Sequence, residues 1–267
     1  VFPLHIWLPA ASVAPTPVTA LLHAVAVVKS GVFAIIRVTY YCYGVEAIRE
    51  TWAQYTALII AIITIVYGSA MALRERHFKR RLAYSTVSNI SYIVFGAMLL
   101  SEAGLAAALM HFLFHSVTKI AAFMNAGAVI ETTEREYIFR LDGLGRKMPV
   151  TFGCFTVSAL SLTGIPLFCG FFSKWNLCTA ALADGGAYGI AGVAALLISA
   201  LFTAIYMFSI VIRAFFRQGE GLEDVHEANW RMSWIALPLA LFMALAFILM
   251  PQLSQYFNSI ASAAFAA

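Results

Sequence analysis

Three lysines, Lys29, Lys119 and Lys174, stand well inside long apolar stretches of this chain. A cation at the centre of a membrane-spanning helix costs about 2.5–3.5 kcal/mol on insertion scales, so charges at that depth indicate function. A lysine amine can take up and release a proton when its surroundings change. The chemistry that these residues would support is therefore proton transfer.

Two histidines accompany Lys119 on the same predicted helix. His111, His115 and Lys119 follow one another at intervals of four residues, which places them on one helix face over about 12 Å. Histidine titrates near neutral pH, so this row is typical of a proton relay. Further polar residues could hold water between these groups: His23, Ser88, Asn89, Ser91, Tyr92 and Asn125.

The carboxylates of the chain lie elsewhere. All thirteen Asp and Glu residues fall in predicted loops or at predicted helix ends. Either the three lysines are uncharged much of the time, or their counter-charges come from a missing part of the protein or a neighbouring subunit.

Each candidate residue also has a simpler explanation. Lys29 and Lys174 could extend to the lipid headgroups. His23, His111 and His115 could simply form hydrogen bonds to a neighbouring helix. His111 and His115 could instead bind a metal, although no Glu stands beside them and no third ligand is near in sequence. We predict no metal and no cofactor in this chain.

The elements that carry these residues are predicted membrane helices. Hydrophobic residues make up 62% of the 267 residues and charged residues 11%, against about 25% charged in soluble domains. Spanning a bilayer takes about 20 mostly apolar residues. We predict an all-α polytopic membrane protein, a single transmembrane domain over 1–267. Its seven helices lie at roughly 16–41, 52–73, 82–100, 103–130, 150–182, 187–212 and 232–250.

The fifth predicted helix, 150–182, is interrupted. It is longer than a simple span and carries Gly164, Pro166 and Gly170 near its middle. Proline removes a backbone donor and clashes with the preceding turn. We predict a broken helix of the kind that lines ion paths, with a packing kink as the alternative.

Positive charge predicts the orientation of the chain in the membrane. Residues 1–15, 74–81, 131–149 and 213–231 form alternate loops that hold twelve of the 17 lysines and arginines, and short cytoplasmic loops retain such charge. We therefore place these loops on the cytoplasmic side of a cell membrane, inner or plasma. The net charge of +4 reflects this orientation rather than nucleic-acid binding. Lipid is an expected partner, with headgroup contacts at 74–81.

Several ordered motifs carry a resemblance to a known family. They are PLHIWLPAASVAPTPVTALLHA (3–24) followed by VVKSGVFAIIR, KRRLAYSTVSNISY (79–92), ALMHFLFHSVTK (108–119), LDGLGRKMP (141–149) and LTGIPLFCGFFSKW (162–175). Together they resemble the antiporter-like subunits shared by respiratory complex I, multisubunit Mrp-type cation/proton antiporters and membrane-bound hydrogenases.

The resemblance implies that the chain is a fragment, the second half of a longer subunit built from two inverted repeats, each with a broken helix. It further implies that Lys29 is a central lysine, that Lys119, His111 and His115 form the connecting path, and that Lys174 is the terminal position. A Glu–Lys pair in the missing N-terminal half would complete the path. Redox reactions would belong to neighbouring membrane-complex subunits, since no nicotinamide, flavin, quinone or iron–sulfur motif occurs here.

We therefore expect a subunit that carries H⁺ along these lysines and histidines near the bilayer midplane, with exchange for Na⁺ left open. Two other classes stay open at this point. A secondary transporter of an anionic solute would use the lysines as ligands. An intramembrane metal-binding protein would use His111 and His115.

Overall fold

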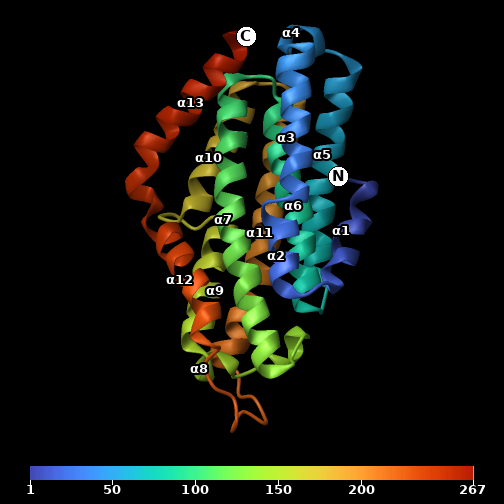
Figure 1. Ribbon diagram of the computed structural model, residues 1–267. Coiled ribbons are helices and arrows are strands. Elements are labelled where there is room, and N and C mark those ends of the chain that lie inside the picture. The colour runs from blue at the N-terminus through green and yellow to red at the C-terminus, as the bar shows by residue number, and fades with distance from the viewer. Residues whose placement is uncertain (267) are drawn as a thin grey trace.

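The computed structural model describes residues 1–266, and most of them are helical (Figure 1). The α-helices are α1 (Trp7–Ala10), α2 (Thr16–Ala24), α3 (Val27–Arg37), α4 (Val45–Ile48), α5 (Trp52–Arg74), α6 (Phe78–Met98), α7 (Glu102–Thr133), α8 (Leu144–Lys147), α9 (Pro149–Thr163), α10 (Cys169–Ala183), α11 (Ala187–Phe216), α12 (Trp230–Leu245) and α13 (Met250–Ala266). Short 3₁₀ segments and one π-helical segment, η3 (Val38–Tyr43), connect or extend them. Over residues 1–266 the β-structure amounts to one bridge between His77 and Tyr137. The predicted all-α fold is confirmed.

Long apolar helices identify the chain as a multi-pass membrane protein. Five stretches have the length and hydropathy of membrane spans: Thr16–Tyr43, Trp52–Arg74, Glu102–Thr133, Ala187–Phe216 and Trp230–Ala266. The more polar α6 is 21 residues long, which corresponds to about 32 Å and is also enough to cross the hydrocarbon. With the α9–α10 pair, all seven predicted segments are helical.

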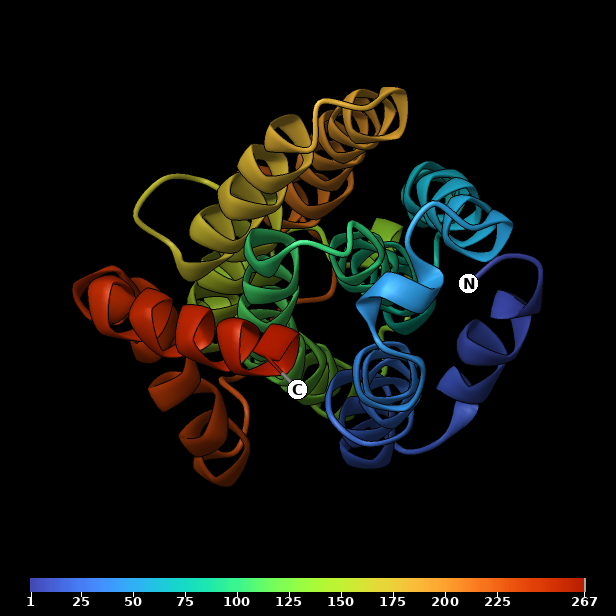
Figure 2. The ribbon, with the colours of Figure 1, turned by 90° about the horizontal axis from the view of Figure 1, so that it is seen from above.

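Helices α6 and α7 occupy the centre of the bundle (Figure 2). Every residue of α6 except Arg80 is buried, because α5, α7 and α3 pack around it. A helix that is enclosed on all sides contacts protein rather than lipid. The centre can therefore contain polar side chains that would be costly on a lipid-facing helix.

The fifth predicted helix consists of two separate helices, as expected. α9 and α10 have 15 residues each, about 22 Å, so each is shorter than the roughly 30 Å hydrocarbon core. Gly164 ends α9 with a φ of +88°, a left-handed conformation that glycine adopts without steric cost. A Cβ at Gly170 would overlap the carbonyl oxygen of Ser161, so this glycine lets α10 approach α9. The predicted interruption around Gly164, Pro166 and Gly170 is confirmed.

Two predicted helices have different bounds in the structure. The first is interrupted at Val25 and Ala26, whose backbone dihedrals are not helical and which separate α2 from α3. The last does not end near 250, because a 3₁₀ turn leads from α12 into α13, which reaches Ala266. α13 is more polar than a simple span, but its buried Phe257, Ala261 and Ala264 recur at helical spacing. Its apolar face packs along α7.

The first residues of the chain lie beside the bundle rather than beyond the helix ends, where a loop over 1–15 was expected. The backbone N–H of Phe2 donates to Thr64 Oγ1 in α5 at 3.0 Å. Nζ of Lys79, at the start of α6, donates to the carbonyl oxygen of Ala14 at 3.2 Å. The exposed side chains of Leu4, Ile6 and Trp7 are apolar, so they can lie against lipid at little energetic cost.

The three basic loops between the helices meet at one end of the bundle, at the bottom of Figure 1. The N–H of Phe78 donates to the carbonyl oxygen of Glu136 at 2.8 Å, and that of Ile138 donates to Arg76 at 3.0 Å. The N–H of Gly143 donates to the carbonyl oxygen of Arg213 at 3.1 Å. The loops that the sequence predicts on one side of the membrane are thus joined by hydrogen bonds.

Candidate functional site

Lys119 of α7 is fully buried against α6. Its Nζ donates to the carbonyl oxygen of Leu82 at 2.9 Å and also hydrogen-bonds Ser85 Oγ. The Phe123 ring lies 5.9 Å away. The polar surface of the enclosed helix α6 thus supplies the hydrogen-bond acceptors that a buried amine requires.

Lys29 extends from α3 to α7. Its Nζ donates to the carbonyl oxygen of Phe112 at 2.9 Å and lies 4.4 Å from the centroid of the Phe112 ring, within cation–π range. The side chain is 2% exposed. The structure therefore places Lys29 inside the bundle rather than extended toward the lipid headgroups.

Lys174 of α10 bridges the helix break. Its Nζ donates to the carbonyl oxygens of Leu162 and, at 3.2 Å, Thr163, the last two residues of α9. These carbonyls have no partner within their own helix, and a donor or a positive charge at a helix C-terminus is favourable. Lys174 therefore stabilises the end of α9.

His111 and His115 lie on one face of α7, as predicted, with ring centroids 6.0 Å apart. Ser173 Oγ donates to the carbonyl oxygen of Gly170 at 3.2 Å, which leaves it to accept a hydrogen bond from Nδ1 of His111 at 2.9 Å. Nε2 of His111 and both ring nitrogens of His115 are buried without a hydrogen-bond partner among the described residues. Unpartnered buried nitrogens are uncommon and indicate a site that a water or a moving proton can use.

His111 and His115 line one small cavity beside the helix break. The lining residues are Asn89, His111, Phe114, His115, Thr118, Ser161, Leu162, Gly170 and Lys174. The cavity measures about 10 Å³, close to the minimum for a single water molecule. Oδ1 of Asn89 is also unpartnered. The cavity therefore brings both histidines and Lys174 around a space of about one water.

His23 and Asn125 lie outside this cavity lining. The His23 ring is 5.1 Å from that of Phe123, the residue that also borders Lys119, and its Nε2 is 3.5 Å from Ser12 Oγ. Nδ1 of His23 and Nδ2 of Asn125 have no partner among the described residues. His23 thus lies beside the residue that borders Lys119, whereas His111, His115 and Lys174 form a separate group at the helix break.

Carboxylates stay away from both groups. The ion pairs within residues 1–266 are Arg49–Glu46, His77–Glu136, Arg80–Glu75, Arg213–Asp142 and Arg217–Asp142. They lie in loops or near helix ends, and none involves Lys29, Lys119 or Lys174. No cluster of three or more potential metal ligands occurs in the part of the chain that the structure describes.

A hydroxyl cluster next to His111 was only partly predicted. Tyr92, which stacks on His111 at 5.3 Å, donates its OH to Ser199 Oγ of α11 at 2.7 Å. Ser88 Oγ lies 3.0 Å from Ser199 Oγ and 2.8 Å from Ser69 Oγ of α5. Ser88 and Tyr92 were expected from the sequence, but Ser69 and Ser199 come from distant helices and single serines carry no spacing signal.

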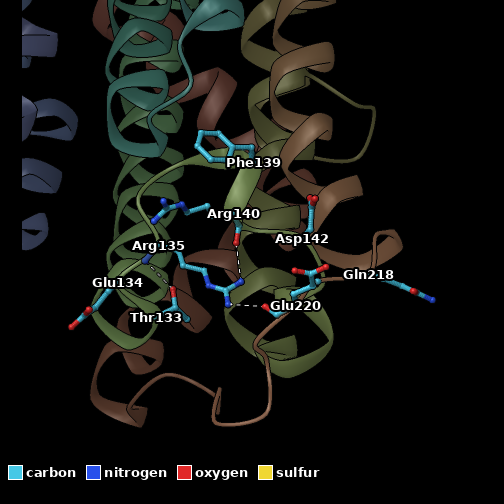
Figure 3. A pocket seen from close by; sticks show the side chains of 9 residues that line it. Thr133, Glu134, Arg135, Phe139, Arg140, Asp142, Gln218 and Glu220 are labelled. Atoms are coloured by element: carbon cyan, nitrogen blue, oxygen red, sulfur yellow. Dashed lines mark hydrogen bonds between the residues drawn. The ribbon is translucent and has the colours of Figure 1, made fainter.

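A much wider pocket opens among the loops at the basic end (Figure 3). It measures about 660 Å³, and Arg135 crosses it to donate to the carbonyl oxygens of Arg140 and Glu220, both at 3.0 Å. Its lining includes Glu134, Asp142 and Glu220 as well as arginines. The pocket is polar and open, and it contains none of the predicted site residues.

Residues 1–203 match the family described as "NADH:quinone oxidoreductase/Mrp antiporter, TM". NADH-quinone oxidoreductase subunit L of Mycobacterium tuberculosis is 37% identical over 241 residues, which cover 89% of this chain and 37% of that protein. Subunit N of Desulforudis audaxviator is 37% identical over 217 residues, covering 81% of this chain and 42% of that protein. The chain thus spans less than half the length of these curated relatives.

Solved structures share the fold over 99% of the chain. A chain of the Mrp complex from Dietzia sp. has a TM-score of 0.90 at 23% identity, with 56% of it covered. A chain of the archaeal membrane-bound sulfane sulfur reductase has a TM-score of 0.87 at 26% sequence identity, and the match covers 53% of that chain. A chain of respiratory complex I from Thermus thermophilus has a TM-score of 0.79 at 22% sequence identity, and the match covers 55% of that chain.

Proposed function

This chain belongs to the NADH:quinone oxidoreductase/Mrp antiporter transmembrane family, and we propose that it moves protons across or along the membrane through its buried lysines and histidines. The observation that carries the proposal is the cavity at the helix break, about 10 Å³ in volume. His111, His115 and Lys174 all line this cavity, and both histidines have buried ring nitrogens without a hydrogen-bond partner among the described residues. A single water in such a space would connect groups that bind and release protons.

The proposed order of transfer follows the position of the side chains. Lys29 receives the proton from a half of the subunit outside this chain and hands it to the histidines of α7, since its acceptor Phe112 is the neighbour of His111. Lys119, with His23 beside Phe123, belongs to the same path. Lys174 at the helix break is the terminal group, which faces an aqueous exit.

Counter-charges for the lysines would come from outside the chain. An opposite charge within a few ångström favours the charged form of a titratable group, and in a low-dielectric interior the interaction is strong. A Glu–Lys pair in the N-terminal half, together with neighbouring membrane subunits, would supply such charges. The forming and breaking of these ion pairs would drive the proton along the path.

The membrane orientation belongs to the same proposal. The joined basic loops, 74–81, 131–149 and 213–231, would face the cytoplasm of a cell whose inner or plasma membrane holds the complex. This assignment rests on the rule that positive loops stay on the cytoplasmic side. Labelling of a cysteine introduced into loop 213–231 with a membrane-impermeant reagent, in intact cells and in inverted vesicles, tests it.

Proton uptake by vesicles that contain the full-length protein in its complex tests the transport proposal. We expect Lys119→Ala to abolish uptake while the complex still assembles, because the substitution removes the buried amine. Lys147→Ala is the matched control, since this lysine is exposed in α8, and it should transport normally. Normal uptake by an assembled Lys119→Ala complex would refute the relay. Repeating the assay with and without Na⁺ decides whether Na⁺ is exchanged.

A further inference from the structure

A third cavity, distinct from the proton site and from the pocket around Arg135, opens between α5, α6 and α11 at the basic end of the bundle. It measures about 450 Å³ and is lined by Leu73, Arg76, Arg81, Ile138, Phe139, Ser209 and Arg213. We call it the arginine pocket. It combines three cations with three large apolar side chains, and no carboxylate belongs to its lining.

The charges of the arginine pocket are only partly offset within the protein. Arg213 donates to Asp142 at 3.0 and 3.2 Å through a single nitrogen, Nη1. Arg81 donates to the carbonyl oxygens of Leu73, Glu75 and Tyr206 and to Ser209 Oγ, but forms no ion pair among the described residues. It therefore contributes positive charge to the pocket while its own donors are occupied.

Arg76 is the free donor of the arginine pocket. Its side chain is exposed and makes no hydrogen bond or ion pair within residues 1–266. The nearest acid in sequence, Glu75, is already engaged, because it pairs with Arg80 at 3.5 Å and accepts from two backbone N–H groups. Two guanidinium groups with donors to spare, Arg76 and Arg213, thus line a space next to a third, buried cation. Guanidinium groups bind phosphate oxygens through such paired donors.

An apolar strip leads away from the arginine pocket along α11. Ser209 and Arg213 line the pocket, and Ile198, Ile205, Ile212 and Phe216 share their side of the helix at intervals of three, four or seven residues. All four apolar side chains are at least 44% exposed. Such a strip, continuous with a phosphate-sized basic site, suits the acyl chains of a lipid whose headgroup lies in the pocket.

We propose that the arginine pocket binds the phosphate of an anionic phospholipid in the leaflet at this end of the molecule. The phosphate contacts Arg76 and the free donors of Arg213, with Arg81 adding charge from below, and the acyl chains lie along the exposed face of α11. A free phosphate ion would make the same contacts with Arg76 and Arg213 but would not contact the apolar strip. The bound lipid would link the loops after α5 and α7 to the end of α11.

Lipid counting on the full-length protein in its complex tests the site. The complex is equilibrated in mixed micelles of phosphatidylglycerol and phosphatidylcholine, and bound lipids are counted by native mass spectrometry. We expect the wild-type protein to retain phosphatidylglycerol selectively. Arg76→Gln should bind phosphatidylglycerol about fivefold more weakly, the effect of removing one basic residue near a lipid headgroup. Arg74→Gln is the matched control from the same loop, because Arg74 is exposed and lies outside the pocket.

Further measurements separate the possible sources of the phosphate. Ile212→Asn keeps every charge and should still weaken phosphatidylglycerol retention, because it interrupts the apolar strip. Displacement of the lipid by excess inorganic phosphate would identify a free-anion site and overturn the lipid assignment. Equal loss in Arg74→Gln and Arg76→Gln, or full retention in Arg76→Gln, would overturn the pocket itself. Thermal unfolding of each variant checks the fold, and Ile212→Asn tests the site independently of Arg76.

Discussion

Nζ of Lys174 lies 3.2 Å from the carbonyl oxygen of Thr163, across the break between α10 and α9. The same amine also donates to the carbonyl oxygen of Leu162. One side chain of the second helix thus occupies the free backbone acceptors at the end of the first. The group that we propose as the terminal proton carrier is therefore also part of the structure of the break, and its two roles can be separated by mutation.

Lys174→Arg should keep the fold and stop transport. Arginine can donate to the same carbonyls but does not release its proton in proteins. Lys174→Met removes the donor as well and should lower the free energy of unfolding by about 1–3 kcal/mol, the cost of unpaired buried acceptors. Unfolding in detergent and proton uptake in vesicles measure the two effects. Wild-type uptake by the arginine variant would show that Lys174 is only structural.

His115→Phe should impair proton transport without lowering stability. Both ring nitrogens of His115 lack a partner among the described residues, so the substitution breaks no hydrogen bond. His111→Phe should also impair transport but cost about 1 kcal/mol, because it removes the bond to Ser173. Unfolding curves and uptake assays on both variants test the difference. A large loss of stability in His115→Phe would assign this histidine to packing.

Gly170→Ala should disrupt the helix break. Its Cβ would overlap the carbonyl oxygen of Ser161, so α9 and α10 would have to separate and the adjoining cavity would change shape. Gly153→Ala in α9 is the control, because nothing lies within 4 Å of a Cβ there, and alanine in a helix gains about 0.5–1 kcal/mol over glycine. Thermal unfolding of both variants measures the contrast. Equal stabilities would mean that the two helices can move apart at little cost.

Ser199→Ala should destabilise the hydroxyl cluster. The substitution removes the acceptor of the Tyr92 OH and a neighbour of Ser88, and an unpartnered buried hydroxyl costs about 1–3 kcal/mol. Ser30→Ala is a suitable control, since Ser30 is exposed and its hydroxyl donates only to the carbonyl oxygen of Ala26, four residues earlier in the chain. Chemical unfolding of the two variants gives the comparison. If both behave like wild type, the buried hydroxyls have alternative partners.

Local spacing was enough to predict that two histidines share a helix face and that one helix is broken. Residues four apart in a helix share a face, so the sequence alone places His111 and His115 together. Glycine and proline commonly mark helix ends, and here Gly164 caps α9 with Pro166 two residues beyond it. The interruption at Val25 and Ala26 could not be predicted in this way, because it contains neither glycine nor proline.

The partners of the lysines depend on tertiary packing and could not be predicted. Lys29 contacts Phe112 from 83 residues away in the chain, and nothing in the sequence indicates which turn of α7 faces α3. The serines at 69 and 199 likewise meet only because α5 and α11 pack side by side. α13 was missed because its polar residues lower its hydropathy, although its apolar face is regular.

The lysine amines donate chiefly to main-chain carbonyls, at Leu82, Phe112, Leu162 and Thr163. A peptide carbonyl is present whatever side chain the residue carries, and it neither ionises nor differs between amino acids. Replacement of any of these four acceptor residues by another helix-forming residue therefore leaves the contact available. A single substitution can therefore remove a lysine donor of the proposed path, but it rarely removes the carbonyl that accepts from it.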